Sequence, residues 1–191
     1  PEIYIVMEHC EYGSLSDVIE NDDIYTINDN HQLVWMEQLA KGLVYLHNRK
    51  VFHRDVKSMN VLIDRHGEAK WSDFGLASKH HSKTFSNTRH AFQGGTANWK
   101  PPEAHATGTY NSKSDVWGFG LIVYHLVEGK QPFDGVSTAA LYGAIVIDFR
   151  LEIKKLEAKE TKEVFKKVFD KCVQPDGSER PTANELLHDI A

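Results

Sequence analysis

Hydrophobic residues follow two different patterns along this chain. The first residues, from Ile3 to Met7, form a continuous apolar run rich in β-branched side chains, which predicts a buried strand. Ser14 and Asp17 then precede apolar residues in the order typical of a helix start. Further on, apolar residues recur three or four positions apart, the period of one helix face. The helices predicted in this way cover 31–48, 113–129, 138–147, 161–173 and 182–190.

Short strands are predicted between the first two of these long helices. Val51 and Phe52 form one short apolar pair, and the segment 61–63 forms another, followed by the turn DRHG and the strand EAKW at 68–71. Residues 73–112 are rich in Ser, Thr, His, Asn and Gly without a period, so this segment is either functional or disordered. The pattern predicts an α+β fold, in which a helical domain carries a small β hairpin and polar loops.

Composition and charge exclude several classes of protein. The chain has 191 residues, 41% of them hydrophobic, which fits one domain with a buried core. Its net charge is 22 − 27 = −5 without a dense basic run, so no nucleic acid is expected as a partner. The longest apolar stretch, 116–127, is too short to span a bilayer and contains His125, so no membrane segment is expected.

The two cysteines and the first residues of the chain indicate the cellular compartment in which we expect the protein. Cys10 and Cys172 are far apart and form no CxxC motif, so we expect a reduced, cytoplasmic protein rather than a disulfide framework, and neither thiol is expected to be a nucleophile. The opening PEIYIVMEHC has neither a basic start nor a small-residue cleavage site, so no signal peptide is expected.

The candidate chemistry lies in the polar loop HRDVKSMN at 53–60. One imidazole, two cations, a carboxylate and an amide within eight positions are unusual as packing, although surface loops also collect charge without a function. SDFG at 72–75 places a second carboxylate after the strand EAKW, and GTANWKPPE at 95–103, DVWGFG at 115–120 and ERPT at 179–182 follow in order. With these five motifs the chain resembles the eukaryotic protein kinase family.

The resemblance implies the protein-kinase-like fold and only part of its domain. Residues 1–191 are expected to be a partial kinase domain with a hinge strand at 1–13, a helical C-terminal lobe at 14–191 and an activation segment at 73–103. No glycine-rich phosphate loop and no VAIK-type lysine occur in the sequence, so we expect the N-terminal lobe to be largely missing and this chain alone to be inactive.

The resemblance also implies the catalytic residues. Asn60 and Asp73 would hold Mg²⁺ with hard oxygen ligands, and Asp55 would accept or orient the proton of the substrate hydroxyl. Lys57 would reach the transferring phosphate and offset its charge. The expected packing and turn residues of this site are His53, Phe74 and Gly75.

ATP is the nucleotide that the family implies. The backbone of Glu8 and Cys10 would hydrogen-bond the adenine, Met7 would be the gatekeeper, and Ser14 would lie near the ribose. Leu62 would form the apolar floor under the base, while Lys57 and Asp73 would lie at the phosphates.

The type of kinase is indicated by a few further positions. Lys57 and Thr96 match serine/threonine kinases, and Glu103, Asp115 and Arg180 favour a protein substrate. In such kinases Glu103 and Arg180 would form a buried ion pair. The motifs are similar to the tyrosine-kinase-like group, notably mixed-lineage MAP kinase kinase kinases, which would place the protein in an intracellular signalling cascade. Pro101 and Trp71 depart from the usual family pattern.

Arg54 directly precedes Asp55, an arrangement that in kinases often receives an activation-segment phosphate. The hydroxyls in reach are Ser82, Thr84, Ser86 and Thr88, of which Thr88 is our first choice. The phosphate would come from an upstream activating kinase or from autophosphorylation in trans.

Two other functional classes remain open from the sequence. A pseudokinase or scaffold would use the same fold to bind partners without catalysis, and a helical interaction domain would carry the motifs by chance. The histidines at 80, 81 and 90 suggest a metal site, but their irregular spacing favours a solvated loop.

Overall fold

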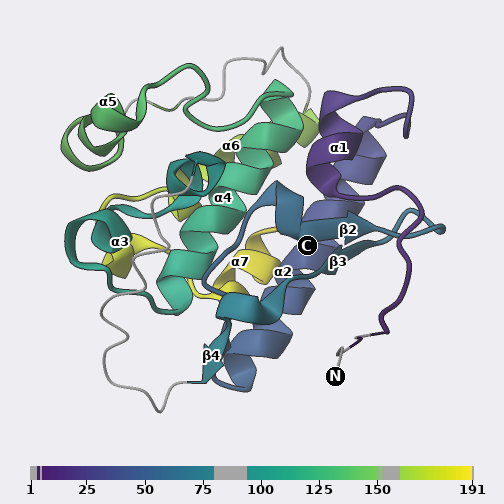
Figure 1. Ribbon diagram of the computed structural model, residues 1–191, viewed down its shortest axis with the longest axis horizontal. Coiled ribbons are helices and arrows are strands. Elements are labelled where there is room, and N and C mark those ends of the chain that lie inside the picture. The colour runs from purple at the N-terminus through teal and green to yellow at the C-terminus, as the bar shows by residue number, and fades with distance from the viewer. Residues whose placement is uncertain (1–3, 5, 80–93, 150, 152–159, 191) are drawn as a thin grey trace.

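The computed structural model describes residues 4, 6–79, 94–149, 151 and 160–190. Its helices pack around α4, which runs through the middle of the molecule in Figure 1, with β2 and β3 to its right and β4 at the bottom of the view. This mostly helical arrangement with a small antiparallel sheet is the fold class expected from the sequence. The α-helices are α1 (Leu15–Glu20), α2 (Asp29–Asn48), α3 (Pro102–Thr107), α4 (Ser112–Glu128), α5 (Thr138–Tyr142), α6 (Glu160–Cys172) and α7 (Ala183–Ile190).

Side-chain caps decide where the first helices begin. Ser14 accepts a hydrogen bond from the Asp17 backbone at 3.2 Å, and the Asp17 carboxylate accepts one from the Ser14 backbone at 3.1 Å, which confirms the predicted start of α1. Asn28 caps α2 in the same way through the His31 backbone at 3.0 Å. The buried side of α2 carries the apolar residues that predicted it, among them Leu39 and Leu43.

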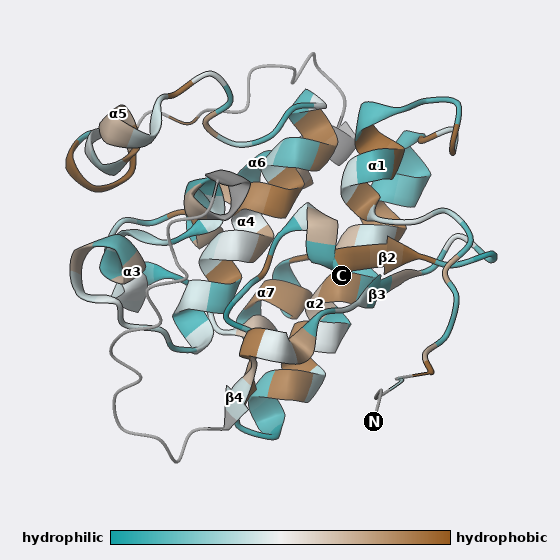
Figure 2. Cartoon of the chain, viewed as in Figure 1, coloured by the Kyte–Doolittle hydropathy of each residue, from teal (hydrophilic) through white to brown (hydrophobic). Residues whose placement is uncertain are grey.

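Helix α4 is buried almost all round and forms the centre of the core. It begins after the cap Asn111 and ends at Gly129, whose φ of 70° is the left-handed conformation of a helix C-terminus. Figure 2 shows hydrophobic residues along α2, α4 and the short strand β2 (Val61–Ile63). Trp117 and Phe119 of α4 are fully buried, so this helix is a fixed base for the loops around it.

Two antiparallel pairs of strands hold the polar loops. The predicted hairpin consists of β2 and β3 (Ala69–Trp71), with Leu62 opposite Lys70. Strand β1 (Val51–Phe52) pairs with β4 (Ser78–Lys79) instead, which brings both ends of the segment 53–77 together. Short single-turn elements complete the chain: η1 (Ser58–Asn60), η2 (Phe74–Leu76), η4 (Gly94–Trp99), η5 (Gly143–Ile147) and η6 (Gly177–Glu179).

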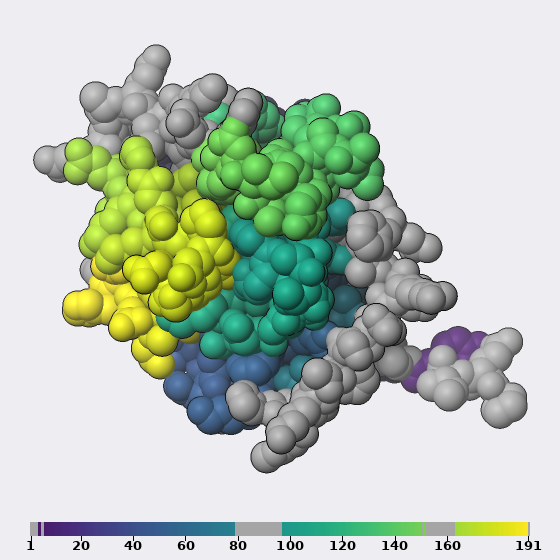
Figure 3. Space-filling model, turned by 90° about the vertical axis from the view of Figure 1, so that its left-hand side faces the viewer, coloured from purple at the N-terminus to yellow at the C-terminus, as the bar shows by residue number. Residues whose placement is uncertain are grey.

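The predicted buried strand at the start of the chain is wrong for the residues that are described. Tyr4, Val6 and Met7 are 80%, 96% and 78% exposed and belong to no strand. Figure 3 shows the first described residues (purple) standing away from the rest of the molecule. A strand is buried only where a neighbouring strand and a covering layer exist, and no described strand pairs with this segment.

The segment 73–112 is also more regular than its composition predicts. The structure has η2, β4, η4 and α3 within it, and residues 80–93 lie outside the described part. Pro102 sits at the first position of α3, where its missing N–H is not needed. Among the described residues, no helix is long and apolar enough to cross a membrane.

Candidate active site

The loop 53–60 is fastened to the core by one buried carboxylate. Asp115 of α4 accepts hydrogen bonds from the backbone N–H groups of His53 at 2.9 Å and Arg54 at 2.8 Å. Its Oδ2 also lies 2.8 Å from Nε2 of His47 in α2. Asp115 is 1% exposed, so losing it would leave buried N–H groups without partners.

His53 links this loop to the segment that carries Asp73. Its ring is fully buried, and Nε2 lies 2.9 Å from the carbonyl oxygen of Ser72, so Nε2 must carry a proton and donate it. The ring also packs against Phe74 at 5.0 Å between centroids. The packing expected of His53 and Phe74 is therefore present in the structure.

Asp55, Lys57 and Asn60 form one hydrogen-bonded cluster. Oδ2 of Asp55 lies 2.7 Å from Lys57 Nζ and accepts a bond of 2.9 Å from Asn60 Nδ2. Asn60 Nδ2 also donates to the Asp55 carbonyl at 2.9 Å. The amide nitrogen of Asn60 is thus used within the loop, and its oxygen accepts no hydrogen bond from the described residues, so this oxygen is the atom suited to a cation.

Asp73 is placed beside this cluster by the hydrogen bonds of the preceding residue, Ser72. The N–H and the hydroxyl of Ser72 both donate to the carbonyl oxygen of Asn60, at 2.9 Å and 3.0 Å. Asp73 itself is exposed and has a left-handed backbone with φ 54°. Its carboxylate accepts a bond of 3.3 Å from Gly75, where a Cβ would approach that oxygen to 3.1 Å, so a small residue suits position 75.

Trp71, one of the departures from the family pattern, is accommodated by α2. Its indole N–H donates to the carbonyl of Leu39 at 3.0 Å. The ring lies against Gly42, where an added Cβ would come within 2.5 Å of it. The bulky side chain therefore fits because a glycine faces it.

Arg54 and Lys100 add positive charge beside Asp55. The Arg54 guanidinium lies 5.2 Å above the Tyr110 ring, and its buried Nε has no hydrogen-bond partner among the described residues. Burial lowers the pKa of Lys100, against the opposing attraction of Asp55. Thr96 lies in η4, and Thr88 with the other three candidate hydroxyls and the histidines at 80, 81 and 90 lies outside the described residues.

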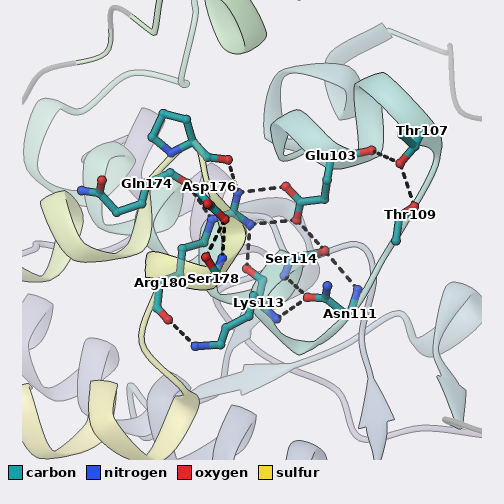
Figure 4. A network of polar contacts seen from close by, with 11 residues as sticks. Glu103, Thr107, Thr109, Asn111, Lys113, Ser114, Gln174, Asp176, Ser178 and Arg180 are labelled. Atoms are coloured by element: carbon teal, nitrogen blue, oxygen red, sulfur yellow. Dashed lines mark hydrogen bonds and ion pairs between the residues drawn. The ribbon is translucent and has the colours of Figure 1, made fainter.

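The expected ion pair between Glu103 and Arg180 is present, as Figure 4 shows. The guanidinium is bidentate, with two N–O distances of 2.8 Å, and Arg180 is 1% exposed. Burial opposes ionisation of Glu103, but the hydrogen bonds and charge of Arg180 outweigh it and hold the pKa of Glu103 below its usual value. Arg180 also donates to the carbonyls of Lys113, Gln174 and Pro175, so it joins α3 to the start of α4 and to the segment after α6.

The residues expected around adenine lie on a segment that is joined to β2. Tyr12 donates its N–H to the Ile63 carbonyl at 3.1 Å, and the Ile63 N–H donates to Gly13 at 2.9 Å. This pairing sets Ser14 opposite the half-buried Leu62. The Ser14 hydroxyl is engaged in capping α1, and Met7 is exposed rather than buried as predicted.

Sequence reasoning missed the ionic contacts of this segment. Lys70 of β3 lies 2.6 Å from Glu8 and 2.8 Å from Asp64, so it ties the expected adenine-binding segment to the hairpin. The hydrogen bond from Lys70 lowers the pKa of Asp64 to about 2. The turn sequence DRHG was a usable signal, since Asp at its first position accepts two backbone N–H bonds, at 2.8 Å and 3.0 Å.

Neither cysteine shows signs of nucleophilic chemistry. Both Cys10 and Cys172 are free thiols. Burial is the main cause that raises the pKa of each, which keeps the thiol protonated at neutral pH. Within the described part of the chain, no group of three or more metal-binding side chains of the His, Cys, Asp or Glu type occurs.

Comparison with known proteins decides the family. The chain matches the protein kinase domain family over residues 1–190. This chain belongs to the protein kinase family. Within this family, 53–60 is the candidate catalytic loop, Asp73 the expected start of the DFG turn and 73–103 the expected activation segment.

Curated relatives of this kinase-family chain include both serine/threonine and tyrosine types. It is 36% identical over 188 residues to the serine/threonine-protein kinase dst1 of Dictyostelium discoideum, covering 98% of this chain and 24% of that protein. It is 32% identical to the serine/threonine-protein kinase CLA4 of Candida albicans, over 97% of this chain and 18% of that protein. It is also 32% identical to the human tyrosine-protein kinase FRK, over 96% of this chain and 36% of that protein. The chain thus spans about a quarter of the length of dst1 and less of CLA4.

Proposed function

We propose that this chain carries the catalytic centre of a serine/threonine protein kinase, which transfers the γ-phosphate of ATP to Ser or Thr hydroxyls of protein substrates. The observation that carries the proposal is the cluster of Asp55, Lys57 and Asn60, in which both donors lie within 2.9 Å of one Asp55 oxygen. Such a cluster next to Asp73 suits phosphoryl transfer, where positioning and charge neutralisation contribute most of the catalysis.

The residues of the site fit ATP with Mg²⁺. Asn60 and Asp73 offer an amide oxygen and an exposed carboxylate, the hard ligands that Mg²⁺ prefers, and the metal would neutralise charge on the phosphates. Asp55 would accept or orient the proton of the attacking hydroxyl. Lys57 lies 2.7 Å from the Asp55 carboxylate and would offer its ammonium to the transferred phosphate.

The acceptor type rests on the sequence and on named relatives. Lys57 in the catalytic loop and Thr96 in the activation segment favour Ser or Thr as acceptor. Serine/threonine-protein kinases such as dst1, CLA4 and STE20 are among the relatives, which supports this acceptor type. The motifs that resemble mixed-lineage MAP kinase kinase kinases support a role in a MAP kinase-type cascade. We further propose a cytoplasmic protein that is activated by an upstream kinase or by autophosphorylation in trans, and we assign it to the mixed-lineage-like group.

The test replaces one carboxylate by its isosteric amide. In the full-length protein, Asp55→Asn should lower phosphate transfer from ATP to a generic protein substrate by about 10²- to 10⁴-fold, because the proton acceptor is lost. Thermal unfolding should change little, since Asn keeps the shape of the side chain. Asp22→Asn, at an exposed position after α1, is the matched control and should keep full activity. Equal rates for the Asp55→Asn variant and the unmodified protein would refute the assignment and favour a binding module.

A further inference from the structure

A fully buried histidine stands directly behind the catalytic loop. His125 of α4 and Ser58 of the catalytic loop are both 0% exposed, and Nδ1 of His125 lies 2.9 Å from Oγ of Ser58. The two residues are 67 positions apart in the sequence. Ser58 follows Lys57 and begins the turn that ends at Asn60. The contact with His125 therefore affects the position of two residues of the proposed catalytic cluster.

The other side of the imidazole faces a carboxylate. Nε2 of His125 lies 3.5 Å from Oε1 of Glu20, which is longer than a well-formed hydrogen bond but close enough for electrostatic attraction. The same Glu20 oxygen accepts bonds from the Ser16 hydroxyl at 3.0 Å and the Gln131 amide at 2.9 Å. Glu20 is therefore fixed in place, and the histidine stands between α1 and the catalytic loop.

The environment selects one form of the ring. Burial lowers the pKa of His125 to about 4, against the opposing attraction of Glu20, so the imidazole is neutral at neutral pH. Of its two nitrogens, Nε2 faces the carboxylate and is the one that the proton favours. Nδ1 is then an acceptor, and the Ser58 hydroxyl donates to it.

Serine, histidine and carboxylate in this order also occur in hydrolases, but the burial argues against a nucleophile here. A nucleophilic serine must reach a substrate, whereas Ser58 is completely enclosed. In hydrolases the histidine accepts the proton of an exposed serine, whereas the Ser58 hydroxyl is used in a contact between two packed segments. The arrangement is therefore suited to holding the loop.

We propose that His125 is a positioning residue for phosphoryl transfer, which fixes the catalytic loop through Ser58 and keeps Lys57 and Asn60 in place against Asp55. The turn is closed by a backbone bond of 3.0 Å from Asn60 to Lys57, and Lys57 provides no side-chain cap for it. The Ser58 hydroxyl thus supplies a side-chain tie from this turn to the rigid helix α4. This inference rests on the proposed kinase function.

The first experiment does not depend on activity. In the full-length protein labelled with ¹⁵N-histidine, NMR at pH 7.5 should show His125 as the neutral Nε2–H form, with Nδ1 accepting a hydrogen bond. Ser58→Ala should shift the Nδ1 resonance of this ring and leave that of the exposed His188 in α7 unchanged. A protonated ring, or the proton on Nδ1, would overturn the proposal whatever the enzyme does.

The second experiment measures the consequence for the rate. Ser58→Ala and His125→Leu should each lower kcat about 10- to 100-fold with the KM for ATP nearly unchanged, because small displacements of catalytic groups have effects of this size. The double variant should be no worse than the poorer single one, since both changes break the same contact. His125→Asn should recover part of kcat, because its amide oxygen can accept from Ser58.

The controls separate this proposal from the kinase assignment. His188→Asn should keep full kcat, and Asp55→Asn tests the assignment itself. If the unmodified protein is active and Asp55→Asn is not, but Ser58→Ala retains full kcat, the positioning role is refuted while the kinase function stands. Should His125→Leu fail to fold, Ser58→Ala still decides, since it removes only one hydroxyl.

Discussion

Two residues of the proposed active site have a backbone that L-amino acids rarely adopt. Arg54 and Asp73 have φ values of 68° and 54°. A left-handed conformation costs a residue with a side chain about 1–2 kcal/mol, so it persists only where the surroundings fix it. Arg54 is fixed by Asp115, and Asp73 follows Ser72, which is bonded twice to Asn60. The strain therefore marks the two places where the chain turns toward the proposed phosphate site.

Replacing Asp73 should affect metal binding and leave the fold intact. Asp73 is exposed, so Asp73→Asn removes the proposed metal ligand without disturbing the core. In the full-length protein, we expect the Mg²⁺ concentration for half-maximal ATP binding to rise about tenfold or more, measured by calorimetry. Nucleotide binding without Mg²⁺ should stay the same and is the internal control. An unchanged Mg²⁺ requirement would remove Asp73 from the ligand set.

At the same scale, the sequence points to candidate catalytic residues more readily than to the residues that hold them in place. Asp55, Lys57 and Asn60 lie within six consecutive positions, so their type and spacing are readable. The contacts of Lys70 with Glu8 and of Ser58 with His125 join residues 62 and 67 positions apart. A local sequence pattern does not predict such contacts, because residues so far apart in the sequence meet only when the chain has folded.

At the scale of elements, helices that begin with a capping side chain were predictable, and one helix without such a cap was missed. Helices α1, α2 and α4 each have a capping side chain and an apolar face, and the sequence located all three. Helix α3 has no hydrogen-bonding side chain at its N-cap, Pro101, and was missed. The strand predicted at Ile3–Met7 failed because a strand pattern states which residues are apolar but not whether a neighbouring strand covers them.

The ion pair between α3 and the loop before α7 should contribute strongly to stability. Arg180→Met removes the partner of the partly buried Glu103, and the expected loss is about 3–5 kcal/mol of unfolding free energy, measured by urea denaturation. Adding Glu103→Leu should restore part of this loss, because the uncompensated charge disappears. Arg65→Met, at an exposed position in the hairpin turn, is the control and should change stability by less than about 0.5 kcal/mol.

The hairpin should weaken in acid through Asp64. Its pKa is lowered to about 2 by Lys70, so the folded state binds the proton more weakly than the unfolded chain does. The resulting stability is present above about pH 4 and is lost as the pH falls toward about 2. In unfolding experiments across this range, the difference between the unmodified protein and Asp64→Asn should therefore shrink with falling pH. A difference that stays constant would show that the carboxylate does not contribute in this way.

At the scale of the whole molecule, the expected activation segment, 73–103, is held near its start and at its end. Near its start, β4 pairs with β1, so that Phe52 lies opposite Ser78. At its end, Glu103 is bound by Arg180. At the end of η4, Trp99 and the next residue, Lys100, line one small pocket together with Asp55 and Arg54 of the proposed active site.

Phosphorylation of Thr88 should raise activity through Arg54. The buried Nε of Arg54 has no hydrogen-bond partner among the described residues, and a phosphate of charge near −2 can accept charge-assisted bonds from a guanidinium. In the full-length protein, phosphatase treatment should lower kcat about tenfold or more. Thr88→Ala should show the same low rate before and after treatment, whereas Ser82→Ala should respond like the unmodified protein. Arg54→Gln should abolish the response to phosphatase even when mass spectrometry finds Thr88 phosphorylated. If the rate of Thr88→Ala still falls on phosphatase treatment and that of Ser82→Ala does not, the regulatory phosphate is on Ser82. If the unmodified protein has equal rates before and after treatment, activation by this route is excluded.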